Sequence, residues 1–503
     1  MTLLGLELNA SRARAVNGAL GDFPCPLPLE PPHVELAMLL SLERSTPAVG
    51  QAGLRLIRQT PHLCYRDFLA GLGAPSAPER SWLGRPKTLD VAEALTHVFR
   101  RLQPITQSSA GVVLALPGYF NSTQAALLRT LATQSRVPIM GSLPIPLATA
   151  LSAYAEQSWH GMAVILDVDD HALTLSTVEA VEGQAHLLET RPYPILGLKL
   201  WKERLLDALS DGCVWQSRRD PRASPLAEQA LYEQLDGVMD ACRQGRLLQI
   251  ALPAANWFQN LIVSPDQPPE FCQSLVHATM QEVEHFLGRP WPEGPPGVIL
   301  LTAAAGRLPG LVQALRAFLE DWKPAPFLRA APISSEDFGE QLFHGGCSGS
   351  TTVLVLSADA PARGAHMIAA YFQRGELLVG HLERMAPLPL PQPVEAGPAR
   401  LHYQGEDYFV NEPRFSLGRQ AGCNLVFDGD LHQGVSPRHC EIVLDYRSFL
   451  LIDRSREGTL VNDAPVSGTT LLRAGDWIRL GPQGPLLRFL GQGPGFSPLS
   501  TTA

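Results

Sequence analysis

The sequence predicts two folded modules of different class, an α/β module in residues 1–376 and an all-β module in residues 399–491. In the first part of the chain, short apolar runs alternate with helix-forming stretches, which is typical of α/β layers. After residue 399, short strand-like segments are separated by Gly, Asn and Asp, and no helical pattern is present. That pattern is typical of a β-sandwich.

Three pairs of segments carry the α/β pattern of the first module. In each pair a run of Val, Leu and Ile, which predicts a buried strand, precedes a longer amphipathic stretch, which predicts a helix. The pairs are 111–117 with 123–135, 163–168 with 198–209, and 297–302 with 309–322. A further amphipathic helix is expected at 229–245.

The eight predicted strands of the second module are short and regularly spaced, as in a sandwich. They are 399–405, 414–418, 424–427, 440–445, 449–455, 459–463, 477–481 and 486–491. Between the modules, residues 385–399 contain five prolines and little charge. Because proline favours extended geometry and cannot continue a helix or a central strand, we place a linker at 377–398. A Gly/Pro/Ser/Thr-rich tail at 492–503 is expected to be loose.

The composition excludes several classes of protein. The 503 residues are 45% hydrophobic and 18% charged, which predicts a globular chain. No apolar run reaches the roughly 18 residues of a membrane span, and the start has no secretory signal pattern. Eight scattered cysteines without a CxxC pair predict reduced thiols and a cytoplasmic location. A net charge of −9 argues against nucleic acid as a partner.

Polar residues of the second module fall at predicted turns, where sandwich loops bind ligands. Arg419 and Ser436 suit a phosphate, because a guanidinium offers a fork of donors and a hydroxyl adds a short charge-assisted bond. The stretches 418–419, 436–439 and 457–462 resemble, in order, the Gly-Arg, Ser-x-x-His and Asn-Gly-Thr-x-Val-Asn motifs of the forkhead-associated (FHA) domain.

The resemblance to FHA domains implies recognition of a phosphothreonine-containing protein. It implies that Arg419 and Ser436 hold the phosphate, that Arg456 adds a clamp, and that His439 braces the turn. Asn462, the last residue of the third motif, is included in the expected phosphopeptide site. One residue departs from the pattern: Glu457 stands where the family has the Asn that grips the peptide backbone. A carboxylate cannot donate to a carbonyl and repels a phosphate, unless it pairs with Arg456 or turns outward.

Segments before residue 377 resemble the ATPase domain of DnaK-type heat-shock chaperones. Leu114–Gln124 is similar to the family's Val-Pro-Ala-Tyr-Phe-Asn-Asp-x-Gln segment, Pro146–Ala155 to its Pro-Thr-Ala-Ala-Ala-Leu-Ala-Tyr helix, and Asp359–Ala370 to its closing helix. The resemblance implies the actin-like ATPase fold, in which two α/β lobes with mixed sheets flank a nucleotide cleft. The peptide-binding part of such chaperones has no counterpart after the linker.

In that fold, glycine-rich turns let backbone N–H groups approach the phosphates. Here the matching turns carry other residues: Glu7, Asn9 and Ser11; Asp167, Asp169 and Asp170; and Ala304 and Arg307. Carboxylates repel a polyanion, and the groups that align and stabilise phosphoryl transfer are missing. We therefore predict a degenerate cleft without catalytic residues, cofactor or metal. ATP with magnesium stays open as an alternative, because these acids are suitable Mg²⁺ ligands.

Three functions follow as hypotheses. The first is a phosphothreonine-dependent adaptor in serine/threonine phosphorylation signalling, with an inactive ATPase-like module. The second is a nucleotide-binding or active DnaK-like ATPase that is regulated through its FHA domain. The third is a scaffold in which neither pocket is used, which is expected if Glu457 blocks the phosphate site. The phosphorylated partner and the oligomeric state do not follow from the sequence.

Overall fold

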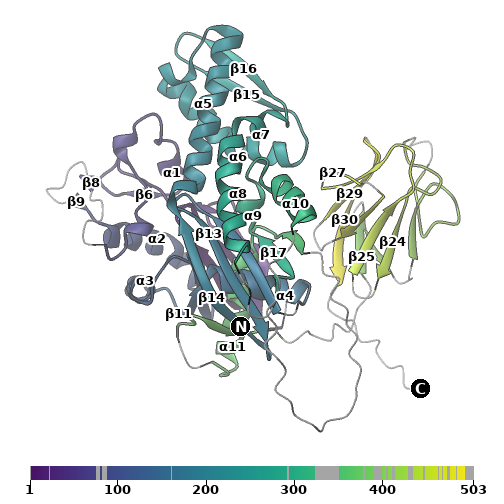
Figure 1. Cartoon of the computed structure of the whole chain (residues 1–503), viewed down its shortest axis with the longest axis horizontal. Helices are drawn as coiled ribbons and strands as arrows, with labels where there is room; N and C mark the ends of the chain where they lie inside the picture. The colour runs from purple at the N-terminus through teal and green to yellow at the C-terminus, as the bar shows by residue number, and fades with distance from the viewer. Residues whose placement is uncertain are drawn as a thin grey trace. The chain divides into compact units, whose positions relative to one another are not determined.

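The computed structural model divides the chain into two compact units, Met1–Leu390 and Pro391–Ala503 (Figure 1). Each unit is described by itself. The structure describes residues 2–21, 23–74, 80–81, 88–159, 161–289, 291, 294–322, 351–377, 380–389, 399–403, 406–410, 414–428, 434–445, 448–462, 464–466, 468–472, 476–482 and 484–492. The predicted tail at 492–503 therefore lies, except for residue 492, outside the described residues.

The first unit contains two six-stranded sheets, and five strands of each share the same topology. The first runs β11-β10-β1-β2-β3, with β4 also paired to β2, and the second runs β18-β17-β12-β13-β14-β19. In each sheet the leading strand, β1 or β12, starts an antiparallel meander of three strands on one side and has two parallel strands on the other. The mixed α/β character predicted for this unit is confirmed.

Three of these strands, β10, β12 and β17, lie at the predicted apolar runs, and the bounds of the others were not predicted. The first sheet comprises β1 (Thr2–Leu8), β2 (Arg12–Ala19), β3 (Cys25–Leu27), β4 (Leu36–Ala37), β10 (Gly111–Leu116) and β11 (Ile139–Pro144). The second comprises β12 (Gly161–Val168), β13 (Leu173–Val181), β14 (Gln184–Tyr193), β17 (Val298–Leu301), β18 (Thr352–Val355) and β19 (Met385–Pro387).

Alternate residues of the leading strands face different cores, because side chains along a strand point to opposite faces. Leu4 and Leu6 of β1 pack into one core with α2 (Val91–Thr106) and α3 (Ser122–Gln134), whereas Leu3 contributes to the core between the two sheets. In β12, Val164 and Leu166 face the core beneath the second set of helices, which comprises α5 (Leu198–Ser217), α6 (Pro225–Arg243), α8 (Gln273–Leu287) and α10 (Leu311–Asp321). Each sheet is thus covered on both faces.

Two helices, α4 (Ile145–Glu156) and α11 (Ala360–Gln373), fill the core between the sheets. They approach very closely, since a Cβ at Gly364 would lie 1.9 Å from the Ala148 carbonyl oxygen. A Cβ at Gly5 of β1 would likewise lie 1.9 Å from the carbonyl oxygen of Ala362. Only glycine allows backbones to meet at this distance, so α11 is fixed against both β1 and α4.

Smaller elements complete the first unit. Among the described helices, none has the length and apolar character that a bilayer span requires. The hairpin formed by β15 and β16 packs against α6, near the top of Figure 1. These elements are β5 (Leu40–Ser41), β6 (Ala48–Val49), β7 (Cys64–Tyr65), β8 (Arg80–Ser81), β9 (Thr88–Leu89), β15 (Leu248–Pro253), β16 (Phe258–Val263), α1 (Gln51–Leu54), α7 (Gln267–Phe271), α9 (Ala303–Gly306) and the 3-10 helices Pro61–Leu63, Leu69–Gly71, Pro194–Leu196 and Pro221–Ala223.

The second unit is a β-sandwich, as predicted, and its described residues contain no helix. One sheet runs β21-β20-β30-β29-β26-β27 and the other β23-β22-β24-β25-β28. The core between them includes Leu417, Ile442, Leu451 and Ile478, all fully buried. The strands are β20 (Ala399–Tyr403), β21 (Glu406–Val410), β22 (Arg414–Gly418), β23 (Leu425–Val426), β24 (Cys440–Asp445), β25 (Ser448–Asp453), β26 (Thr459–Val461), β27 (Ala464–Pro465), β28 (Thr469–Leu472), β29 (Trp477–Leu480) and β30 (Leu486–Gln492).

The linker prediction starts too early. Residues 385–387, at the head of the proline-rich run, form β19 and pair with Gln184–His186 of β14. Proline is tolerated there because β19 is an edge strand. The backbone N–H groups on its outer side have no partner strand, so the N–H that proline lacks is not needed. The first unit therefore extends to residue 390 rather than 376.

Candidate functional site

Three loops of the second unit meet around Ser436. Arg419, which follows β22, donates its backbone N–H to the Ser436 carbonyl oxygen (3.2 Å). A Cβ at Gly418 would lie 2.2 Å from the Pro437 carbonyl oxygen, so glycine is needed where these loops touch. The third loop is joined through the Ser436 hydroxyl oxygen, which accepts the backbone N–H of Arg456 (3.1 Å). The structure thus brings together the three residues predicted to hold a phosphate.

His439 braces this arrangement, as predicted. Its Nδ1 accepts the backbone N–H of Ser436 (3.0 Å), and its Nε2 lies 3.2 Å from the carbonyl oxygen of Gly458. The imidazole therefore carries its proton on Nε2 and donates it to Gly458. Burial lowers the pKa of His439, although the bond to Gly458 partly offsets this effect. The ring is neutral at pH 7 and keeps the Ser436 loop in place through both nitrogens.

Asp453 shapes the third loop. Its Oδ1 accepts the backbone N–H (3.0 Å) and hydroxyl (2.8 Å) of Ser455 and the hydroxyl of the buried Thr459 (2.7 Å). Burial opposes ionisation of Asp453, but these hydrogen bonds outweigh it and lower its pKa. A turn built in this way holds residues 454–458 in a fixed conformation.

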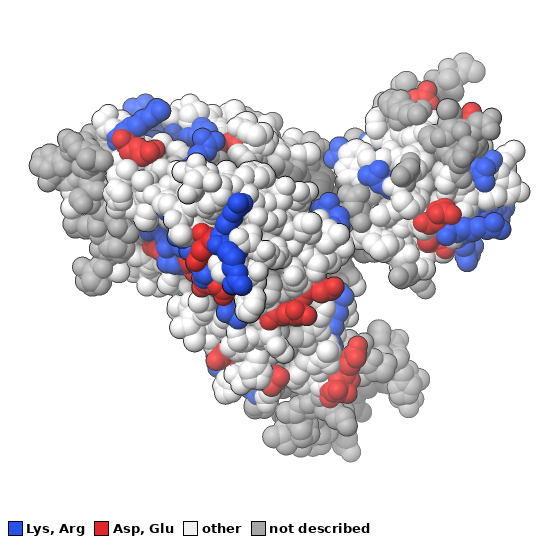
Figure 2. Space-filling view, turned by 90° about the horizontal axis from the view of Figure 1, so that it is seen from above, with Lys and Arg blue, Asp and Glu red and all other residues white. Residues whose placement is uncertain are grey.

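Three exposed arginines lie on the loops that meet at the buried Ser436. Among the described residues, Arg419, Arg438 and Arg456 form no ion pair, whereas Arg414 and Arg454 both approach Glu441. Unpaired guanidinium groups around a hydroxyl are suited to a dianionic phosphate. In Figure 2, basic and acidic side chains lie next to one another on the second unit, at the right. Arg438 lay inside the Ser-x-x-His motif but was not identified from the sequence as a ligand.

The other two predicted site residues behave differently. Glu457 is exposed and forms no ion pair with a described residue, so it does not pair with Arg456. Asn462 has a left-handed backbone (φ 51°), and its amide is already used: Nδ2 donates to Asp476 (2.7 Å) and Oδ1 accepts the Trp477 N–H (2.9 Å). These bonds give Asn462 a role in joining β26 to β29.

In the first unit, the turn between β1 and β2 is closed by Asn9. Its Oδ1 accepts the backbone N–H groups of Ser11 and Arg12, both at 3.0 Å, and its Nδ2 donates to Glu7 (2.7 Å). An Asn side chain that caps its own turn in this way accepts hydrogen bonds from backbone N–H groups that a glycine-rich turn would leave free.

The matching turn between β12 and β13 is built identically with Asp169. Its Oδ1 accepts the backbone N–H groups of His171 and Ala172, both at 3.0 Å. Its Oδ2 accepts the backbone N–H of Ala10 (3.0 Å) and the hydroxyl of Tyr119 (2.7 Å). The Asp169 side chain thus contacts both turns, although residues 10 and 169 are far apart in sequence.

Ser11 and Asp170 form a second bridge between the turns. The Ser11 hydroxyl donates to Asp170 Oδ1 (2.9 Å), and the Asp170 backbone N–H donates to the Ser11 hydroxyl oxygen (2.8 Å). Together with the bonds to Asn9 and Asp169, every backbone N–H in residues 10–12 and 170–172 has an acceptor within the protein. No amide of either turn is left for a phosphate.

Glu7 and Asp167 occupy equivalent places, each next to last in the leading strand of its sheet. Burial raises the pKa of Glu7 to about 7, opposed by Arg14 and Arg12 and reinforced by Asp167. Burial also raises the pKa of Asp167 to about 6, with Asp169 adding to the effect and a hydrogen bond from Thr302 (2.8 Å) opposing it. Among the described residues, no group of His, Cys, Asp and Glu is placed to hold a metal ion.

The third predicted turn begins at Thr302, which contacts Asp167, and its later residues contact the helices. Ala304 is buried in α9, and Arg307 at its end forms ion pairs with Asp236 (3.1 Å) and Asp240 (2.7 Å) of α6. Lys202 of α5 also pairs with Asp236 (2.8 Å). These cations hold the pKa of Asp236 well below its usual range despite its burial.

A cavity of about 280 Å³ opens between these charged helices and the first turn. Its polar lining includes Arg12, Glu35 and Lys202, none of which was predicted from the sequence. Glu35 accepts hydrogen bonds from Arg12 (3.2 Å) and from Arg14 (2.8 Å to Nε). Arg12 lies in β2, Lys202 in α5 and Glu35 in the bend before β4, and no motif marks these positions in the sequence.

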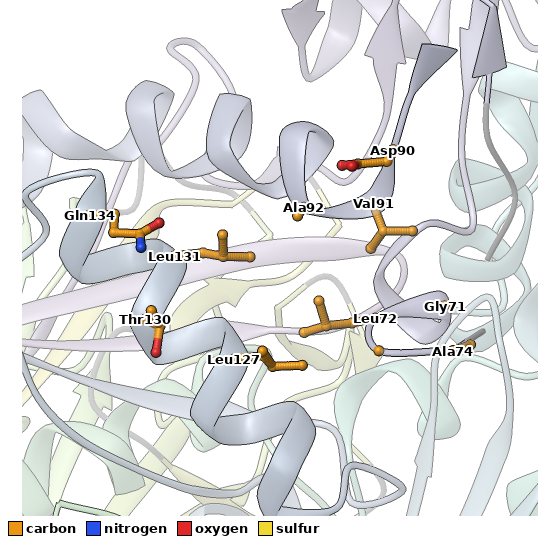
Figure 3. Close-up of a pocket in the computed structure, with 11 residues that line it drawn as sticks. Gly71, Leu72, Ala74, Asp90, Val91, Ala92, Leu127, Thr130, Leu131 and Gln134 are labelled. Carbon is orange, nitrogen blue, oxygen red and sulfur yellow. The ribbon is translucent and has the colours of Figure 1, made fainter. Parts of the chain in front are cut away.

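A larger cavity, of about 510 Å³, lies beside α2 and α3 (Figure 3). Leu72, Val91, Leu127 and Leu131 extend into it. Asp90, the one titratable group among the described residues of its lining, is used to cap α2 by accepting the Glu93 N–H (2.7 Å). Its described lining is therefore largely apolar, with Thr130 and Gln134 as further polar residues.

Comparison with known protein families finds that residues 415–481 match the FHA domain family. The match covers the three motifs identified in the sequence, and the sandwich of the second unit fits it. The second unit therefore contains an FHA domain. A search of curated proteins finds no match to the chain.

Proposed function

We propose that this chain is an adaptor that binds phosphothreonine-containing proteins through its FHA domain, in serine/threonine phosphorylation signalling. The observation that carries the proposal is that the backbones of Arg419 and Arg456 are hydrogen-bonded to Ser436, while the exposed side chains of both arginines form no ion pair with a described residue. The Ser436 oxygen already accepts the Arg456 N–H, so its own proton is available for an anion.

The chemistry favours a phosphate dianion over a carboxylate. A phosphate has three terminal oxygens, enough to accept from the Ser436 hydroxyl and from more than one guanidinium. Each charge-assisted hydrogen bond contributes about 1.5–3 kcal/mol. The loops that carry these donors are fixed by His439 and Asp453, so little ordering is needed when the phosphate binds.

Titration of the whole chain with phosphothreonine peptides tests the proposal. Calorimetry should detect binding of a phosphothreonine peptide and none of the same peptide without phosphate. Binding of both forms with equal affinity would mean that the sandwich recognises proteins without reading phosphate. No binding of any phosphothreonine peptide in a degenerate library would reject the proposal.

Replacing Glu457 with Asn should strengthen phosphopeptide binding. At about 5 Å and an effective dielectric near 20, repulsion between a carboxylate and one phosphate charge is about 3 kcal/mol before screening. Because Glu457 is exposed, solvent and salt reduce this, and we expect a gain of roughly 3–10-fold in affinity.

Two further variants separate charge from shape. Glu457→Gln removes the charge but keeps the longer side chain, and Glu406→Gln removes an acidic charge elsewhere on the same unit. If repulsion is the cause, Glu457→Gln gains affinity too and the gain shrinks as salt is raised. Equal affinity of Glu457→Asn and wild type would show that the carboxylate points away from the ligand.

For the first unit we propose a non-catalytic, actin-like scaffold related to DnaK-type ATPases. Support comes from the repeated topology of its two sheets and from the two helices between them. Two observations support the proposal that this unit does not bind a nucleotide. The side chains of Asn9 and Asp169 accept hydrogen bonds from the backbone N–H groups of the turns, and Arg307 forms ion pairs with Asp236 and Asp240. Labelled ATP, with and without Mg²⁺, should then show no submillimolar binding.

A further inference from the structure

The Asp169 carboxylate lies at the centre of four hydrogen-bond donors. They come from three parts of the chain: the turn after β1, the turn after β12, and Tyr119, which follows β10. Residue 169 is only 3% exposed, so the carboxylate is almost completely withdrawn from water. The donors are the backbone N–H groups of Ala10, His171 and Ala172 and the hydroxyl of Tyr119.

Several backbone N–H groups and a hydroxyl that converge on one point form the kind of nest in which proteins bind anions. A carboxylate buried without such donors would be costly, and Asp169 has donors on both oxygens. The burial and position of Tyr119 fit this role, because burial and then the neighbouring Asp169 keep its pKa well above the usual value. Its phenol therefore remains a donor at physiological pH.

We propose that the Asp169 carboxylate is the built-in occupant of an anion site and that it fastens the two halves of the first unit together. The inference rests on the proposed non-catalytic role of this unit and deepens it. A free anion that bridged the two turns would hold them only while bound, whereas Asp169 holds them permanently. The Ser11–Asp170 pair reinforces the same contact from the side of the cavity.

The inference predicts that removing this carboxylate creates a site for a free anion. In Asp169→Ala the N–H groups of Ala10, His171 and Ala172 lose their acceptor, and inorganic phosphate has the oxygens to replace it. The adjacent cavity of about 280 Å³ gives room for a longer anion such as pyrophosphate. Its charged lining comprises Arg12 and Lys202 together with the carboxylates of Glu35, Asp170 and Asp236, so we expect inorganic phosphate to be the better probe.

Calorimetry with inorganic phosphate and pyrophosphate on the full chain provides the test. Wild type should bind phosphate only at the FHA domain, where a saturating phosphothreonine peptide displaces it. With that peptide present, we expect phosphate or pyrophosphate to bind Asp169→Ala at least tenfold more tightly than wild type. Asp169→Asn, which still fills the nest, should bind less tightly than Asp169→Ala. Asp266→Ala, which removes an exposed carboxylate at the start of α7, serves as the matched control and should behave as wild type.

The inference is overturned if, with the peptide site saturated, folded Asp169→Ala binds phosphate and pyrophosphate no more tightly than wild type. If Asp169→Ala does not fold, hydrogen exchange on wild type decides. Segments 8–12 and 168–173 should exchange slowly, with no change when phosphate is added. Fast exchange, or protection that appears only with phosphate, would contradict a built-in occupant.

These outcomes are separate from those of the phosphopeptide proposal. Phosphothreonine peptides are titrated onto the same variants, and their affinity should be that of wild type. If Asp169→Ala gains no phosphate binding while peptides bind normally, only the role proposed for Asp169 is rejected. If peptides do not bind while Asp169→Ala binds phosphate tightly, only the function proposed for the FHA domain is rejected.

Discussion

Substituting Arg419 by Ala should weaken phosphothreonine-peptide binding by roughly 10–100-fold, equivalent to the 1.5–3 kcal/mol typical of a charge-assisted hydrogen bond. Arg419 is exposed, but its backbone N–H is bonded to the Ser436 carbonyl oxygen, so its side chain starts from a fixed point beside the hydroxyl. The lost guanidinium leaves the phosphate without its planar, two-pronged donor. Calorimetric titration of wild type and variant measures the change directly.

Arg400→Ala is a matched control, because it removes the same charge from a strand of the same unit, where Arg400 pairs with Asp407 (3.2 Å). The control should change affinity by less than about threefold, an effect of overall charge alone. Arg419→Lys distinguishes charge from geometry: it keeps the cation, so partial recovery is expected but not full affinity. Equal binding by wild type and Arg419→Ala would exclude this residue from the phosphate site.

Substituting Glu7 by Gln should stabilise the first unit at alkaline pH. The pKa of Glu7 is raised from 4.5 to about 7, so the folded state prefers the neutral acid. Between pH 4.5 and pH 7 the Glu7 carboxyl is protonated in the folded state and ionised in the unfolded state. The contribution of Glu7 to the free energy of unfolding is therefore fully present below pH 4.5 and is lost as pH rises toward 7. The loss is about 3 kcal/mol, since each pKa unit corresponds to 1.36 kcal/mol.

Gln imitates the protonated acid at every pH, and its oxygen can still accept the hydrogen bond from Asn9. The stability of Glu7→Gln should therefore match that of wild type near pH 5 and exceed it at pH 8. At pH 8 the melting temperature of the first unit, measured by calorimetry, should be a few degrees higher in the variant. Glu320→Gln, an exposed change on α10, should leave the wild-type pH profile unaltered. A Glu7→Gln profile that falls with pH as steeply as wild type would contradict the role assigned to Glu7.

Much of this architecture follows from local sequence patterns. Buried strands such as β10, β12 and β17 are continuous apolar runs, and the helices after them have amphipathic periodicity, so each could be predicted. Strand β19 was missed because its sequence is dominated by the proline signal. This strand forms by pairing with the edge of β14, which is about 200 residues away in the sequence. Local sequence propensity does not predict such a distant pairing.

The candidate sites divide in the same way. Arg419, Ser436 and His439 belong to motifs of fixed spacing, and the structure brings them together as expected. In the first unit, the acids of the two turns were predicted to repel a ligand. That they accept the turns' own amides depends on distances such as that between Ala10 and Asp169, which no single segment encodes. The pairing of Lys202 and Arg307 with Asp236 is equally non-local.

Strand β19 has a practical consequence for dividing the chain. It covers the start of β14, and the bonds Leu187 N–H to Arg384 (2.7 Å) and Leu388 N–H to Gly183 (2.9 Å) extend that cover at both ends. A fragment ending at residue 376 would lack this strand and expose a bare sheet margin that can recruit another molecule. Fragments intended for solution work on the first unit should therefore retain the chain through residue 390, although its proline content suggests a natural place to cut.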